Sequence, residues 1–469
     1  MSELWRRSAM DLAQLIASRQ ASSAEVVDAH LARIEAVNPR LNAVVRVLAE
    51  TARAAATAAD RKVAAGEVLG PLHGVPITVK ENIDMAGLPT TNGVVPLAHA
   101  TAPVDAPVVE RMRAAGAIPI GRTNLPDFGM RVHTDSALHG LTRNPWDATR
   151  TAGGSSGGEA AALAAGMSPL GLGNDIGGSL RNPANACGIA SIRPTLGRVP
   201  DAFSGPVADR QLAVQLMAVQ GPMARRVADV RLGLQVLSGA HPRDPWSLDP
   251  PAPAPPTNGP TRVAVVAAPP GAPTDPAVSA GVRRAADALA DAGYDVVDAC
   301  PPRYIDAVSV WARFLMGDLA LGFPDMMAMM GPDGRAFLEA ANAGTPPLAD
   351  PLDLSRLMVA RDSVGREWSL FMAEHPLVLS PTWTTLPFTH GYDIAGPKSA
   401  MAVLALMRPV VPANLLGLPS ACVPAGLDPA SELPVGVLLT GRRMRDDECL
   451  DAAEAVEAKL GLATPIDPR

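Results

Sequence analysis

Gly153-Gly154-Ser155-Ser156-Gly157-Gly158 is the first of two glycine–serine loops, and Gly173-Asn174-Asp175-Ile176-Gly177-Gly178-Ser179 is the second. Paired glycines let the backbone turn sharply and let a ligand approach its N–H groups closely. A serine beside such N–H groups suits acyl transfer, because the nucleophile must lie next to donors for the developing oxyanion. Either loop alone is most simply a tight turn. The two together favour a hydrolase with a serine nucleophile.

Two other interpretations of these loops fail in detail. A phosphate-binding loop ends in Gly-Lys-Ser or Gly-Lys-Thr, which follows neither loop. Residues 153–157 match the G-x-S-x-G nucleophile elbow, but that motif follows a strand. Here Asn144-Pro145-Trp146-Asp147 precedes it, and the last histidine of the chain, His390, comes too early for the histidine of that fold. Ser155 is therefore not expected to be the nucleophile.

Further characteristic stretches extend outward from the two loops along the chain. They are Gly74-Val75-Pro76-Ile77-Thr78-Val79-Lys80-Glu81-Asn82, Gly121-Arg122-Thr123-Asn124, Asn144-Pro145-Trp146-Asp147, Arg193-Pro194-Thr195, Gly221-Pro222-Met223-Ala224-Arg225, Asn414-Leu415-Leu416-Gly417-Leu418-Pro419 and Leu433-Pro434-Val435-Gly436-Val437. Together with the two loops, and in this order, they resemble the signature of the amidase signature family. The resemblance covers almost the whole chain and is weak only between about 240 and 400.

The resemblance implies a role for each matching site residue. Ser179 would be the nucleophile, Ser155 a bridging serine after a cis Gly154–Ser155 peptide, and Lys80 the final base. The backbone N–H groups of an oxyanion hole would come from Ile176, Gly177, Gly178 and Ser179. Ser156, Asp175 and Arg181 would support that loop, and Gly129 and Met130 would lie beside the acyl group of the substrate.

The chemistry of lysine agrees with this assignment. A serine hydroxyl is a poor nucleophile until a base takes its proton. A lysine can be that base in its neutral form but not as an ammonium. Lys80 must therefore be desolvated enough to lower its pKa. We expect the apolar run from Val75 to Val79 to supply that burial. No metal ligand set is apparent, and no cofactor is expected.

Alternating short apolar runs and helical segments predict an α/β fold, a central twisted mixed β-sheet with helices on both faces. Expected strands include 43–48, 74–79, 117–121 and several in 410–439, while helices are expected at 26–37, 50–65, 276–292 and 446–460. We expect one amidase domain over 1–469. It would have a signature core at about 70–235, a proline-rich linker at about 241–260, and a variable, mostly helical pocket region at about 300–400.

The composition of the chain limits the classes of partner that it can be expected to bind. The net charge of −7 and the lack of basic runs argue against nucleic acid. The uncharged stretch 409–427 is broken by prolines, so it is not expected to span a membrane. Four widely spaced cysteines fit a cytoplasmic protein. A small-molecule amide, carbamate or ester is the expected partner, with a homodimer kept as an alternative to a monomer.

The expected function is hydrolysis of amide-type C–N bonds in small, mainly apolar substrates, including anilides, carbamates or urethanes, and esters. The alternatives are the glutaminase subunit of a tRNA-dependent amidotransferase and a non-catalytic binding protein on the same fold. Arg131 is expected to pair with Asp127 or Asp135 rather than to bind a substrate carboxylate. The methionines at 316, 326, 327, 329 and 330 form either a lid or ordinary core packing.

Overall fold

The computed structural model describes residues 3–203, 210–251, 259–320, 322–346, 348, 350 and 352–469. Within these residues, eleven short strands form one mixed sheet. Their spatial order is β1 (Val44–Val47), β3 (Ile118–Thr123), β2 (Pro76–Lys80), β6 (Leu170–Asp175), β8 (Val219–Ala224), β7 (Ala190–Arg193), β12 (Ser420–Leu427), β13 (Pro434–Gly441), β11 (Leu377–Pro381), β9 (Arg262–Val265) and β10 (Asp295–Asp298). A separate hairpin pairs β4 (Asp135–Ser136) with β5 (Gly140–Leu141).

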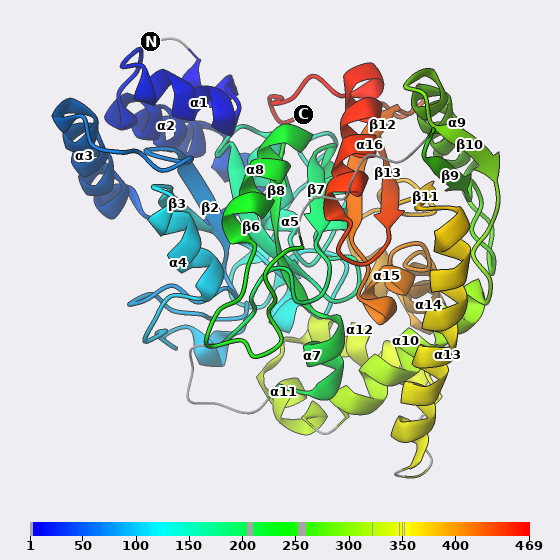
Figure 1. Ribbon diagram of the computed structural model, residues 1–469. Coiled ribbons are helices and arrows are strands. Elements are labelled where there is room, and N and C mark those ends of the chain that lie inside the picture. The colour runs from blue at the N-terminus through cyan, green and yellow to red at the C-terminus, as the bar shows by residue number, and fades with distance from the viewer. Residues whose placement is uncertain are drawn as a thin grey trace.

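Helices cover both faces of the sheet (Figure 1). One apolar layer packs α1 (Ala9–Ala17), α4 (Pro107–Ala114), α8 (Val227–Leu237), α9 (Pro276–Asp291) and α16 (Asp446–Leu460) against it. The other layer contains α2 (Ser23–Leu41), α3 (Ala49–Ala65), α5 (Gly157–Ala164), α6 (Arg181–Cys187), α7 (Leu212–Met217) and α15 (Val411–Leu416). This arrangement confirms the predicted α/β fold with helices on both sides.

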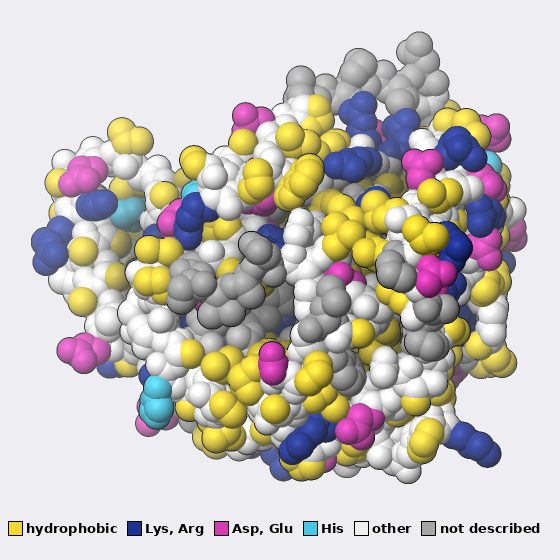
Figure 2. Space-filling model, turned by 90° about the horizontal axis from the view of Figure 1, so that it is seen from below, with side chains coloured by type: hydrophobic (Ala, Val, Ile, Leu, Met, Phe, Trp, Pro, Cys, Tyr) yellow, Lys and Arg dark blue, Asp and Glu magenta, His cyan; other side chains and the backbone are white. Residues whose placement is uncertain are grey.

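A helical region continues the second layer below the sheet in the view of Figure 1. It consists of α10 (Tyr304–Leu319), α11 (Phe323–Met329), α12 (Pro332–Ala343), α13 (Leu352–Glu374) and α14 (Pro397–Ala405). Figure 2 shows this side of the molecule, where hydrophobic side chains gather between scattered charged ones. Within the described residues, no helix is long and apolar enough to cross a membrane.

Sequence expectations and observed elements agree best where the apolar pattern is strong. The expected strand at 74–79 is β2, and the expected helix at 50–65 is α3. The pattern missed β6 and β7, which lie in the glycine-rich part of the chain. It was wrong at 411–416, where α15 forms instead of a strand. An apolar run alone does not separate a buried helical turn from a strand, which explains this error.

Residues 241–251 form most of the described part of the proline-rich segment expected at about 241–260. The N–H of Leu248 donates to the carbonyl of Gly197 at 2.8 Å, and that of Asp244 to the carbonyl of His241 at 2.9 Å. The rest of that expectation, at 252–258, lies outside the described residues. Backbone contacts thus hold the beginning of this segment against the signature half of the chain.

Candidate active site

Lys80 ends β2, and its side chain lies on the opposite face of the sheet from the apolar residues before it. Val75, Ile77 and Val79 belong to one apolar layer, because alternate side chains of a strand point to opposite faces. Lys80 is fully buried on the other face. The expectation that the apolar run would bury Lys80 is therefore wrong. On this face its amine contacts Ser155 of the first loop and Asn174 of the second.

The amine of Lys80 has two close partners. Nζ donates to Ser155 Oγ at 2.7 Å and to Asn174 Oδ1 at 2.6 Å. Burial lowers the pKa of Lys80 to about 7, although the negative charges of Asp175 and Glu159 act in the opposite direction. An amine with this pKa is partly neutral at neutral pH, so it can accept a proton.

Ser155 follows a cis Gly154–Ser155 peptide bond, as the resemblance implies. There is no room for a side chain at Gly154, where a Cβ would lie 2.7 Å from Arg131 O. Thr134 Oγ1 donates to Gly153 O at 2.9 Å and accepts from Gly157 N at 3.1 Å. The segment around 131–134 therefore fixes this loop from one side.

Asn174 is a site residue that sequence reasoning missed. Its Oδ1 accepts from Lys80, while its Nδ2 donates to Asn82 Oδ1 at 2.9 Å. Asn82 stood in the quoted lysine segment and Asn174 in the second loop, so both were visible as amides next to expected site residues. The Oγ of Ser156, expected to support the loop, approaches Asn174 O at 3.5 Å.

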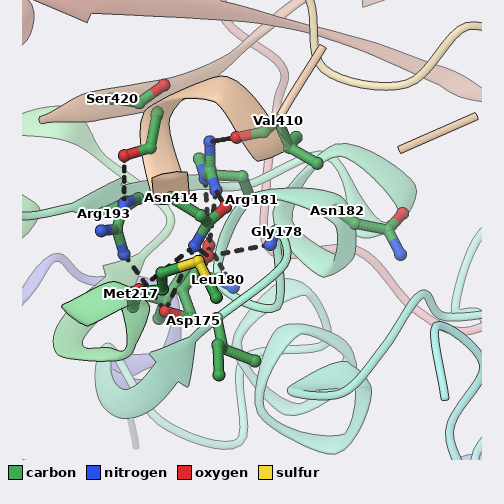
Figure 3. Close-up of polar contacts among 12 residues, drawn as sticks. Asp175, Gly178, Leu180, Arg181, Asn182, Arg193, Met217, Val410, Asn414 and Ser420 are labelled. Atoms are coloured by element: carbon green, nitrogen blue, oxygen red, sulfur yellow. Dashed lines mark hydrogen bonds and ion pairs between the residues drawn. The ribbon is translucent and has the colours of Figure 1, made fainter. Parts of the chain in front are cut away.

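Asp175 is the centre of a buried polar network beside the second loop (Figure 3). Its carboxylate accepts from Arg181 Nε at 3.0 Å and Nη2 at 2.9 Å, from Asn414 Nδ2 at 2.8 Å, and from the backbone N–H groups of Gly178 at 2.8 Å and Leu180 at 3.1 Å. Burial alone would raise its pKa, but Arg181 and Arg193 hold the pKa of Asp175 well below its ordinary value. The loop is therefore built around a permanent carboxylate.

The backbone donors of the second loop are not equivalent. The N–H of Gly178 already has the Asp175 carboxylate as its acceptor. Within the described chain, the N–H groups of Ile176, Gly177 and Ser179 make no hydrogen bond. Of the four donors expected for an oxyanion, these three are available and the fourth is engaged.

Ser179 lies on the wall of a cavity of about 320 Å³, where its side chain is nearly buried. Gly129 and Met130, expected beside the acyl group, line the same cavity. Its other walls are mostly apolar and include Trp311, Leu315, Met316, Phe337, Leu338, Ala341, Leu404 and Met407. A small apolar molecule placed there would contact Ser179. No hydrogen bond joins Ser155 Oγ to Ser179 Oγ among the described residues.

Gly129 brings the cavity wall next to Ser155. Its φ of +70° is a left-handed conformation that favours glycine, and a Cβ there would lie 3.2 Å from Ser155 Oγ. Of the methionines in the 316–330 segment, Met316 belongs to the described lining of the cavity. Met316 and Met330 pack with Leu338 in a small apolar cluster, and Met326 and Met327 flank it.

Arg131 forms an ion pair, but not with the expected partners. Its Nε donates to Asp393 Oδ2 at 2.8 Å and its Nη2 to Asp393 Oδ1 at 3.0 Å, and both side chains are buried. Asp127 instead accepts from the backbone N–H groups of Ala137 and Gly331. The pairing with Asp127 or Asp135 was wrong because the true partner lies 262 residues away in the sequence.

Glu159 is a second residue that sequence reasoning missed. It is fully buried in α5. Its carboxylate accepts a hydrogen bond from the hydroxyl of Thr78, two residues before Lys80, and another from the hydroxyl of Thr123, the latter at 2.8 Å. Burial raises the pKa of Glu159 to about 7, opposed by these two hydrogen bonds and by Lys80. Among the described residues, no cluster of His, Cys, Asp and Glu could hold a metal ion.

Comparison with known proteins agrees with this geometry. The family model described as Amidase matches residues 25–450. The chain belongs to the amidase family. This confirms the resemblance seen in the sequence, and the chain is accordingly a hydrolase of amide-type C–N bonds.

Individual relatives of this amidase cover nearly its full length. An indoleacetamide hydrolase from Bradyrhizobium diazoefficiens is 45% identical over 464 residues, which are 98% of this chain and 87% of the relative. A glutamyl-tRNA(Gln) amidotransferase subunit from Acidothermus cellulolyticus is 35% identical over 490 residues, covering 98% and 95% of the two chains. A solved structure of 6-aminohexanoate cyclic dimer hydrolase with its substrate is 28% identical, with a TM-score of 0.85 and 99% of each chain covered.

Proposed function

We propose that this amidase hydrolyses amides of small, mainly apolar acyl groups through an acyl-enzyme on Ser179. The observation that carries the proposal is the place of Ser179. It lies on the wall of an apolar cavity, next to unengaged backbone N–H groups, in the same loop as the Asn174 partner of Lys80. A serine hydrolase needs these three features together, namely a nucleophile, donors for the oxyanion, and a base.

In the proposed reaction, neutral Lys80 accepts a proton from Ser155, which accepts one from Ser179. Ser179 Oγ then attacks the amide carbon, and the N–H groups of Ile176, Gly177 and Ser179 stabilise the oxyanion. One such donor can lower the barrier by about 3–4 kcal/mol. The proton returns through Ser155 to the leaving nitrogen, and water then releases the acid from Ser179. Within a hydrogen-bonded pair such as Lys80 and Ser155, at 2.7 Å, such a transfer needs no large movement.

The substrate class follows from the cavity and from the relatives. A volume of about 320 Å³ and walls such as Met130, Trp311 and Phe337 suit one planar apolar group. Together with the similarity to an indoleacetamide hydrolase, this favours arylacetamides as preferred substrates. Anilides, carbamates or urethanes, and esters would pass through the same tetrahedral oxyanion and are proposed as slower or secondary substrates.

The alternative is the glutaminase activity of a tRNA-dependent amidotransferase, which the 35% identity to the Acidothermus cellulolyticus relative favours. Glutamine carries an ammonium and a carboxylate that need charged partners in the site. Two arginines line the cavity, Arg131, which is paired with Asp393, and Arg313, but its described lining contains no Asp or Glu that could bind the ammonium of glutamine. We place the apolar amide first for this reason.

A direct comparison of substrates tests the proposal. Ammonia release by the purified protein would be measured for indole-3-acetamide, phenylacetamide, acetamide and L-glutamine. We expect the highest kcat/KM for the two arylacetamides. A preference for L-glutamine would favour the amidotransferase-type activity instead. The Ser179→Ala variant is the control for each active substrate, because its residual rate reports any other enzyme in the preparation.

A further inference from the structure

The loop that carries the proposed oxyanion donors is held from two sides. On one side, the Asp175 carboxylate accepts from the N–H groups of Gly178 and Leu180. On the other side lies Trp311 of α10, 135 residues later in the sequence. Its indole Nε1 donates to Ile176 O at 3.0 Å. The carbonyl next to the donors is therefore fixed by a residue of the variable helical region.

Trp311 also packs on the backbone of the loop. A Cβ placed on Gly177 would lie 2.8 Å from Trp311 Cζ2, so the ring occupies the space where a side chain would be. Trp311 is only 6% exposed, and it lines the cavity that contains Ser179. One ring thus contacts both the loop backbone and the space proposed for the substrate.

Because Ile176 C=O and Gly177 N–H belong to one peptide unit, the hydrogen bond from Trp311 to the Ile176 carbonyl also affects the Gly177 N–H. A trans peptide unit is planar, and its C=O and N–H groups point in opposite directions. Only Gly154–Ser155 and Thr464–Pro465 are cis among the described residues, so the Ile176–Gly177 unit is trans. A hydrogen bond that fixes the Ile176 carbonyl therefore also fixes the direction of the Gly177 N–H.

We infer that Trp311 is a positioning residue for the oxyanion site, holding the Ile176–Gly177 peptide plane so that the Gly177 N–H keeps its direction during the reaction. The inference rests on the proposed function, in which that N–H stabilises the oxyanion on the acyl group of Ser179. Donors fixed before the reaction stabilise the transition state without the cost of reorganising. The same residue is one of the aromatic residues that line the cavity, which links substrate contact to the proposed catalytic loop.

A buried tryptophan in the same region provides a matched comparison. Trp368 of α13 is 3% exposed, and its ring lies 5.8 Å from that of Tyr304. Its Nε1 is buried without a hydrogen-bond partner within the described residues. Replacing Trp368 therefore removes an indole of the same size and burial, but no bond to the loop.

The test compares Trp311→Phe with Trp368→Phe on whichever amide the wild type turns over best. Phenylalanine keeps an aromatic wall but has no N–H donor. We expect Trp311→Phe to lower kcat roughly 10-fold, less than the loss of a whole oxyanion donor, with KM within about twofold. Trp368→Phe should leave both constants near the wild-type values. A KM that rises while kcat is unchanged would make Trp311 a pocket wall only and overturn the inference.

A second variant covers the possibility that Trp311→Phe unfolds or repacks. Incorporation of 3-benzothienylalanine at position 311 keeps the shape of the ring and replaces the N–H by sulfur. The same fall in kcat supports the inference, and wild-type kcat contradicts it. Equal losses in the Trp311 and Trp368 variants would also contradict it, since both would then report packing. If Ser179→Ala stayed active, the proposed function would fail first, independently of Trp311.

Discussion

Lys80 is the residue whose charge decides whether the proposed mechanism can start. Its pKa near 7 lies far below the usual value of 10.5, because burial disfavours the ammonium form. Below about pH 7 the ammonium form prevails and cannot accept a proton. Above it the neutral amine prevails. We therefore expect kcat/KM to rise with pH through about 7 and to level off above it.

A substitution at Asn174 should change the pH at which kcat/KM rises. Asn174→Asp would place a carboxylate 2.6 Å from Nζ, where it would stabilise the ammonium form beside the existing charges of Asp175 and Glu159. We expect the rise in kcat/KM to shift by about one to two pH units toward higher pH. A pH–rate profile of the variant checks this. If kcat/KM rose at the same pH as in the wild type, a group other than Lys80 would control the pH–rate profile.

Asp175 leads to a prediction on stability. Asp175→Asn would leave the buried charge of Arg181 without its carboxylate, and breaking a buried pair costs about 3–5 kcal/mol. Urea unfolding should show a loss of that size in the free energy of unfolding. Asp298→Asn, which breaks the exposed pair with Arg283, serves as the comparison and should change stability little. Similar effects from both variants would contradict the structural role of Asp175.

For single residues, the sequence indicates which side chains belong to the candidate site better than it indicates what those side chains contact. Motif matches pointed to Lys80, Ser155 and Ser179, and the structure brings Lys80 and Ser155 into contact. The partner of Arg131 and the position of Trp311 depend on residues far apart in the chain, in the part where the resemblance is weak. No local pattern specifies such contacts.

Among the elements, α12 connects the signature half to the cavity. Asp127 Oδ2 accepts from Gly331 N at 2.7 Å, just before α12 begins at Pro332. Phe337, Leu338 and Ala341 of this helix line the cavity. A loop contact near Ser155 therefore sets the position of one cavity wall.

Asp127→Ala should loosen this wall. The N–H of Gly331 would lose its acceptor, and α12 could move away from the apolar substrate. We expect KM for the best arylacetamide to rise several-fold, with a smaller change in kcat. Steady-state kinetics would be compared with Asp325→Ala, an exposed aspartate of α11. An unchanged KM would show that α12 does not depend on Asp127.

The sequence predicted the sheet of the signature half better than the helical region. Strands such as β2 have strong apolar patterns, whereas β6 is rich in glycine and gives no pattern. The expectation of a mostly helical region at 300–400 agrees with α10 to α13, but their packing around the cavity could not be derived. Helix packing depends on contacts between elements, whereas periodicity reports only one face of each helix.

For the whole molecule, the proposed function places substrate choice and chemistry in different halves of the chain. Lys80, Ser155 and Ser179 come from the signature half, while most cavity walls come from α10, α12 and α14. A change in the walls should thus alter which amide is accepted without removing the proposed machinery.

Ala341→Phe tests this separation. The larger side chain would fill part of the cavity from α12. We expect kcat/KM for indole-3-acetamide to fall at least about tenfold, since overpacking commonly costs about 1–3 kcal/mol, while acetamide is still hydrolysed. Ala336→Phe, on an exposed face of the same helix, is the matched control. Equal losses for large and small amides in Ala341→Phe would contradict a cavity-based preference.

The central claim is that Ser179, rather than Ser155, carries the acyl group. The most direct measurement is peptide mapping by mass spectrometry after acid quenching of the enzyme during turnover of an arylacetamide or its ester. The account predicts the arylacetyl mass on the peptide that contains Ser179, and its absence from Ser179→Ala. An acyl group on Ser155, or the same adduct in Ser179→Ala, would contradict it.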